Sequence, residues 1–158
     1  MIFDFFERKA HMPQPSFVHL RLHSEFSVQD GITRIKDAVK LAAVDQQGAL
    51  ALTDLGNTFG LIKFYKAAQG AGVKPIMGAD IWLTNVDDLA QPYRMLLLVK
   101  NRAGYLRLCD LLSQAYLQTD RLTHGQIHPK WLIDHPELNL GLIALSGAHW
   151  GDVGQALL

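Results

Sequence analysis

Short apolar runs alternate along this chain with stretches in which apolar residues recur every three or four positions. The runs predict strands at 17–23, 49–53, 74–84, 94–100 and 140–146. The spaced patterns predict helices at 32–43, 60–69, 103–118 and 130–133, and a last one beginning at 151, with Thr33 as a possible cap of the first. Strands that alternate with helices favour βαβ units, so we expect an α/β fold with mostly parallel strands.

Polar residues interrupt the first apolar run at every second position, as His19, Arg21 and His23. Successive side chains of a strand point to opposite faces, so these three are expected on one face. Imidazoles two residues apart suit Zn²⁺, Mn²⁺ or Fe²⁺ when carboxylates join them. Arg21 is a permanent cation and cannot ligate a metal. His23 also fits a second role, as a hydrogen-bonded histidine of the core.

Two aspartates accompany the next predicted strands: Asp54 directly follows one and Asp80 lies within another. In α/β proteins the carboxyl ends of the strands form the functional rim, so both are candidate site residues. Each also has a structural interpretation. Asp54 fits a turn or a helix cap, and Asp80 fits a structural pair with a cation.

Composition narrows the class of protein. The chain has 158 residues, 49% hydrophobic and 19% charged, which fits a globular domain. Its net charge of zero argues against a free-standing nucleic-acid binder. The single cysteine, Cys109, excludes an internal disulfide and fits a reducing, cytoplasmic compartment. No apolar run approaches the roughly 20 residues that span a bilayer, so no membrane is expected.

The two ends of the chain also carry expectations. Residues 1–15 are interpreted as an N-terminal extension, either disordered or an artefact of the assigned start. Residues 151–158 begin an apolar helix without a stop signal, which predicts that 16–158 form a truncated domain.

Three long stretches carry a resemblance to a known family: VHLRLHSEFSVQDG, ALTDLGNTFGLIKFYKAAQGAGVKPIMGAD, and LLLVKNRAGYLRLCDLLSQAY with the later GLIALSG. They closely resemble the PHP (polymerase and histidinol phosphatase) domain that opens the alpha subunit of bacterial DNA polymerase III. The resemblance runs from residue 16 to residue 158. It implies an α/β fold, the first part of a distorted seven-stranded β/α barrel.

The resemblance also locates the metal ligands of the family, and this chain departs from them. In metal-binding members the first motif is His-x-His, which falls here on Arg21-Leu22-His23. The second motif is Asp-His, which falls on Asp54 and Leu55, so the carboxylate is kept and the imidazole is lost. Neither arginine nor leucine donates to a metal ion.

Three further positions differ as well. The third motif ends in Gly-x-Glu in the family and in Asp80 here, a shorter carboxylate. Metal-binding members have a histidine at the position of Arg94 and a cysteine at the position of Ala148. We therefore expect no bound metal, and we predict that Arg21 replaces the lost cations by pairing with Asp80, Asp54 or both. The alternative is that Arg21 only caps an exposed strand end.

The resemblance implies a function by analogy. It indicates the N-terminal part of a replicative DNA-directed DNA polymerase alpha subunit, with a metal-free, catalytically silent PHP domain. That domain would support the polymerase core and contact the proofreading exonuclease subunit and other replisome subunits. Primer-template DNA and the Mg²⁺ of nucleotidyl transfer would belong to the parent protein, whose palm domain is absent here.

A different class of function stays open at this stage. The chain is alternatively an active metal-dependent PHP phosphoesterase, acting as an exonuclease or on small phosphate esters. In that case His19, His23, Asp54 and Asp80 would hold a single metal ion.

Overall fold

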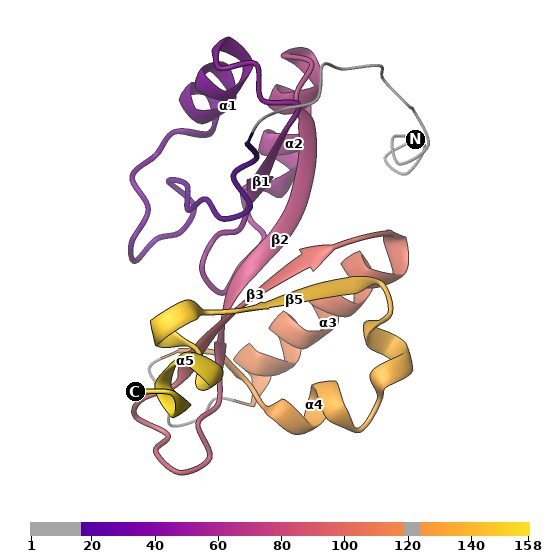
Figure 1. The fold of residues 1–158 in the computed structure, drawn as a ribbon. Helices are drawn as coiled ribbons and strands as arrows, with labels where there is room; N and C mark the ends of the chain where they lie inside the picture. Colours follow the sequence, from indigo (N-terminus) through magenta and orange to yellow (C-terminus); the bar gives the residue numbers. More distant parts are fainter. Residues whose placement is uncertain (1–16, 119–123) are drawn as a thin grey trace. The chain divides into compact units, whose positions relative to one another are not determined.

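The computed structural model describes residues 17–118 and 124–158 (Figure 1), so the predicted extension at 1–15 lies outside the described residues. The chain divides into two compact units, Met1–Gly78 and Ala79–Leu158. Strand β2 (Lys74–Leu83) contributes its first residues to the first unit and the remainder to the second.

The first unit contains a βαβ arrangement. Strand β1 (Ala49–Leu52) is buried throughout and runs parallel to the start of β2, with Ala49 opposite Lys74 and Leu52 opposite Met77. Helix α2 (Leu61–Gly70) connects the two strands, and helix α1 (Ile35–Val44) precedes them. The helices pack against each other and each contacts β1. Their inward residues supply the core of this unit: Ile35, Val39, Ala42, Leu61, Phe64 and Ala68.

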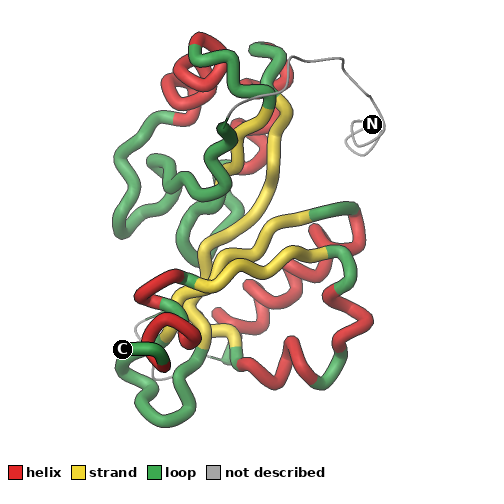
Figure 2. Tube along the Cα trace, viewed as in Figure 1, coloured by secondary structure: helices red, strands yellow, loops and turns green. Residues whose placement is uncertain are grey.

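The predicted strand at 17–23 is not a regular strand in the structure (Figure 2). The segment does lie beside β1, because Ala51 N–H donates to the His19 carbonyl and Thr53 N–H donates to the Leu22 carbonyl, both at 2.9 Å. Leu22 N–H, however, donates to the Thr53 side-chain oxygen at 2.9 Å. A hydroxyl therefore takes the place of a backbone acceptor and interrupts the ladder.

The predicted cap at Thr33 is also wrong. Helix α1 begins at Ile35, and its N-cap residue is Arg34, which makes no capping hydrogen bond through its side chain. Thr33 instead forms a parallel bridge with Ser24, and its carbonyl accepts from Glu25 N–H at 2.8 Å. Pairing with the loop before the helix removes Thr33 from the capping position.

The second unit is built around the remainder of β2 and the neighbouring β3 (Tyr93–Val99). Strand β5 (Leu142–Ser146) pairs antiparallel with β3, and the short β4 (Gln126–Ile127) pairs parallel with β2. Helix α3 (Arg102–Leu117) packs against β3 and β5. The remaining elements are α4 (Pro129–Ile133), α5 (Asp152–Ala156) and 3₁₀ turns at Pro136–Asn139 and Ala148–Trp150.

Most elements of this unit match the sequence pattern, with two exceptions. Strand β4 has no counterpart among the predicted strands, because two residues are too few to show a period. The apolar run at 140–146 is typical of a buried strand, yet in β5 Ile143 is 45% exposed and Ala144 is exposed as well. Its apolar sequence predicts burial but does not say which element covers it.

None of the helices in the described part of the chain combines the length and the apolar character that crossing a membrane requires.

Candidate functional site

Asp54 is the second residue after β1 and is 1% exposed. Its carboxylate accepts two hydrogen bonds from one residue, Ser24: the backbone N–H at 2.6 Å and the hydroxyl at 3.0 Å. Burial raises the pKa of Asp54 above its ordinary value of 3.8, and the two hydrogen bonds from Ser24 oppose that rise without cancelling it. Asp54 therefore anchors the loop that carries Ser24.

A second carboxylate organises the same loop. Asp30 accepts from the Ser27 hydroxyl at 2.6 Å and contacts His23 Nδ1 at 2.9 Å. The Ser27 oxygen in turn accepts Leu55 N–H at 2.9 Å. His23 is thus hydrogen-bonded within the loop, as one interpretation held, but it lies at the edge of the core because its partner Asp30 is 39% exposed. The Leu55 side chain is buried at 8% exposure.

The raised pKa of Asp54 gives a prediction for Asp54→Asn. A carboxyl group whose folded pKa lies above its unfolded pKa favours the folded state below pH 3.8, and this advantage is lost as pH rises through the folded pKa. The asparagine does not titrate. The free energy of unfolding of the wild type minus that of the variant should therefore decrease as pH rises from 3.8. Urea denaturation of both proteins at pH 3.8 and at successively higher pH measures this difference in the free energy of unfolding. A difference that increases with pH would contradict the prediction.

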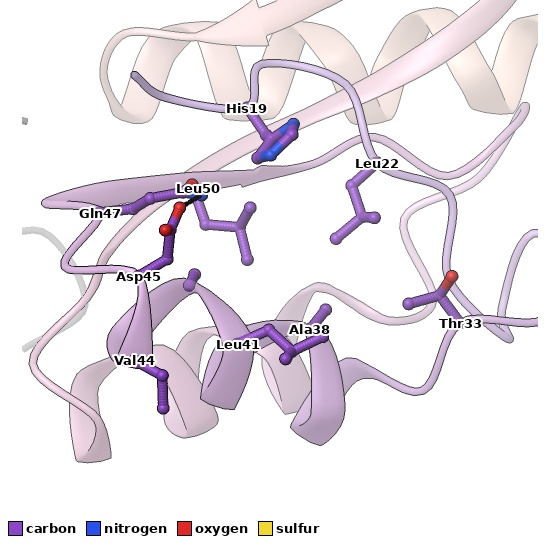
Figure 3. A pocket seen from close by; sticks show the side chains of 10 residues that line it. His19, Leu22, Thr33, Ala38, Leu41, Val44, Asp45, Gln47 and Leu50 are labelled. Atoms are coloured by element: carbon purple, nitrogen blue, oxygen red, sulfur yellow. Dashed lines mark hydrogen bonds between the residues drawn. The ribbon is translucent and has the colours of Figure 1, made fainter. Parts of the chain in front are cut away.

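His19 lies in different surroundings from His23. It lines a pocket of about 550 Å³ between the 17–23 segment, β1 and α1, where Leu22, Leu41 and Leu50 are neighbours (Figure 3). Its ring also meets that of Phe17 edge-on, with centroids 4.7 Å apart. The structure therefore gives the two histidines separate contacts, one with an apolar pocket and one with a carboxylate.

In the second unit, Asp80 of β2 is 2% exposed and faces Arg94 of β3. Arg94 Nε donates to Asp80 Oδ1 at 3.2 Å, and Arg94 Nη2 donates to Asp80 Oδ2 at 2.9 Å. The guanidinium carbon also lies 4.2 Å from the centroid of the Trp82 ring. His124 stacks on the same indole, with centroids 5.2 Å apart and an interplanar angle of 17°.

Sequence reasoning missed the role of Arg94, which it recorded only as the loss of a histidine. The available signal was the position of Arg94 at the start of a strand that follows the one carrying Asp80. Selecting Arg94 as the partner of Asp80 required knowing that the two strands are neighbours in the sheet. Arg21 is exposed, and its pairing with Asp80 or Asp54 stays a prediction. Ala148 is also exposed, and it begins a 3₁₀ turn with a φ of 51°.

The side chains at the positions considered do not fit a metal centre. Arg21, Leu55, Arg94 and Ala148 offer no ligating atom. Both oxygens of Asp54 and both oxygens of Asp80 already accept hydrogen bonds from protein donors. Across 17–118 and 124–158, no group of three or more histidine, cysteine, aspartate or glutamate side chains is arranged to hold a metal ion.

The chain belongs to the PHP domain family, whose model matches residues 19–158. The sheet described above, in which β1–β2 and β2–β4 are parallel and β3–β5 is antiparallel, confirms the predicted α/β fold class with mostly parallel strands. Among curated relatives, DNA polymerase III subunit alpha of Neisseria meningitidis serogroup A is 48% identical over 148 residues, which cover 93% of this chain and 13% of the relative. The same subunit of Escherichia coli K12 is 46% identical over 148 residues, which cover 93% of this chain and 12% of the relative. The chain thus spans only a small part of these relatives.

Two solved structures are similar at a lower level. An amidohydrolase from Chromobacterium violaceum has a TM-score of 0.49 and 22% identity, covering 62% of this chain and 32% of that one. A putative metal-dependent phosphoesterase from Bifidobacterium adolescentis has a TM-score of 0.47 and 16% identity, covering 63% of this chain and 32% of that one.

Proposed function

We propose that this chain is the N-terminal part of a bacterial replicative DNA polymerase alpha subunit, and that its PHP domain is a metal-free, catalytically silent scaffold. The similarity to polymerase III alpha subunits over 93% of the chain supports the first half of the proposal. The hydrogen-bonded carboxylates support the second half. In this proposal the parent protein, with Mg²⁺ in its palm domain, extends primer-template DNA in the cytoplasm.

The observation that carries the silent state is the replacement of ligands by groups that cannot bind a metal. PHP phosphoesterase chemistry needs an ion that activates water and neutralises the phosphate ester. At Arg94 the chain has a guanidinium that binds Asp80 instead. Among the described residues, the Asp54 carboxylate accepts hydrogen bonds in one unit and the Asp80 carboxylate pairs with Arg94 in the other, so both carboxylates hold loops and strands in place.

Metal analysis and hydrolysis assays test the silent state. The 158-residue chain, purified without chelator, is expected to contain far less than one zinc, manganese or iron per chain. It should also not hydrolyse p-nitrophenyl phosphate when Zn²⁺ or Mn²⁺ is added. Stoichiometric metal together with hydrolysis that a chelator abolishes would instead support the metal-dependent phosphoesterase.

The scaffold role has its own experiment. The full-length alpha subunit of the same organism is expected to bind the proofreading exonuclease subunit in a saturable manner in surface plasmon resonance. Substituting the PHP domain by an unrelated domain should abolish that binding. Retained binding without the PHP domain would contradict the proposed contact.

A further inference from the structure

We propose that Arg94 is a built-in cation, which neutralises Asp80 in the way that a divalent ion does in metal-binding PHP domains and so prevents an ion from returning. This inference rests on the proposed metal-free function and goes one step further. It assigns the replacement of the metal to a particular side chain, and it explains how the metal-free state is kept.

The strand geometry brings the three interacting groups together. Asp80 and Trp82 are two residues apart on β2, so their side chains lie on the same face of that strand. Arg94 reaches them from the neighbouring β3. The guanidinium therefore has a carboxylate at its edge and an indole ring against its face.

The contact has the form of a strong ion pair. Two nitrogens of the guanidinium donate to two different oxygens, which is the bidentate arrangement that arginine forms with carboxylates. The side chains of Arg94 and Asp80 are 11% and 2% exposed, so solvent screens their attraction poorly. The indole of Trp82 adds a cation–π contact, which favours a charged group at this position.

Charge balance explains why the pair excludes a metal ion. Asp80 carries one negative charge and Arg94 one positive charge, so the pair is already neutral. A divalent ion at Asp80 would have to displace the guanidinium from both oxygens and then lie beside its positive charge. Restoring ligands elsewhere would not remove this obstacle while Arg94 is present.

A double-mutant cycle tests the cation role in the 158-residue chain. Arg94→Gln should lower the melting temperature by on the order of 10 °C. The same change made together with Asp80→Asn should lower it by much less than in the wild-type background, because the carboxylate that Arg94 neutralises is then absent. Arg94→Lys keeps the positive charge and loses the bidentate hydrogen bonds, so its melting temperature should lie between those of the wild type and Arg94→Gln. Equal effects of Arg94→Gln in both backgrounds would show that Arg94 only packs on Trp82 and would overturn the proposal.

Added zinc tests the exclusion. The melting temperature of the wild type should not respond to Zn²⁺. Arg94→His removes the cation and supplies an imidazole beside Asp80, which makes only two ligands, so its melting temperature should rise only at high Zn²⁺ concentration. A rise in the wild type as large as that in Arg94→His would overturn the exclusion. Metal found in the wild type as purified would overturn the proposed function and the exclusion together, whereas a failed double-mutant cycle in metal-free protein would overturn only the cation role of Arg94.

Discussion

Replacing Gly104 by alanine is expected to destabilise the second unit by about 3 kcal/mol. Gly104 is a buried residue in the first turn of α3, and a Cβ atom there would collide with the carbonyl oxygen of Gly141. That carbonyl also accepts Lys100 N–H at 2.8 Å, so the backbone of Gly141 is tied to the end of β3. Neither chain segment can move aside without losing a contact.

Gly70→Ala is the matched control for this prediction. Gly70 is the last residue of α2, and a Cβ placed on it meets no other part of the chain within 4 Å beyond its own helix backbone and chain neighbours. Both changes replace a helical glycine by alanine. That replacement by itself stabilises a helix by at most about 1 kcal/mol. Chemical denaturation of the two variants therefore isolates the collision. If Gly104→Ala is as stable as Gly70→Ala, the close approach of the two backbones is wrong.

The close approach at Gly104 illustrates what the sequence predicts and what it does not. The helix around 103–118 follows from apolar spacing, which is a local property of the chain. The need for glycine at 104 arises because the segment entering β5 lies against the start of α3. The neighbour, Gly141, is 37 residues further along the sequence than Gly104, and no local pattern indicates the contact.

The same distinction applies to the candidate site. Asp54 and Asp80 could be selected because each accompanies a buried strand, and the departures at Arg21, Leu55 and Arg94 are visible once the family is recognised. The partners of the carboxylates were not predictable in this way. Ser24 reaches Asp54 through a loop, and Arg94 reaches Asp80 because β3 is the neighbour of β2. Pairing between strands is decided by tertiary packing, which overrides local pattern.

Arg107 provides the second large expected effect. It occupies a helical position among apolar neighbours of α3 and is 9% exposed. Its guanidinium donates to Asn139 Oδ1 at 3.3 Å, to Asp110 Oδ2 at 2.9 Å and to the carbonyl of Trp131. Arg107 thus joins α3 to α4 and to the turn that leads into β5, the strand paired with the one carrying Arg94.

Arg107→Met is therefore expected to cost about 2–3 kcal/mol, because it leaves two partly buried acceptors, Asn139 Oδ1 and the Trp131 carbonyl, without their donor. Amide hydrogen exchange should increase first in α4, whose last turn depends on this contact. Arg102→Met is the control, since Arg102 is exposed at the start of the same helix and the change should stay within about 0.5 kcal/mol. Equal stability of the two variants would mean that Arg107 packs as an aliphatic chain and that its hydrogen bonds contribute little. In that case α4 would be held by its apolar contacts alone, and its exchange rates would not change.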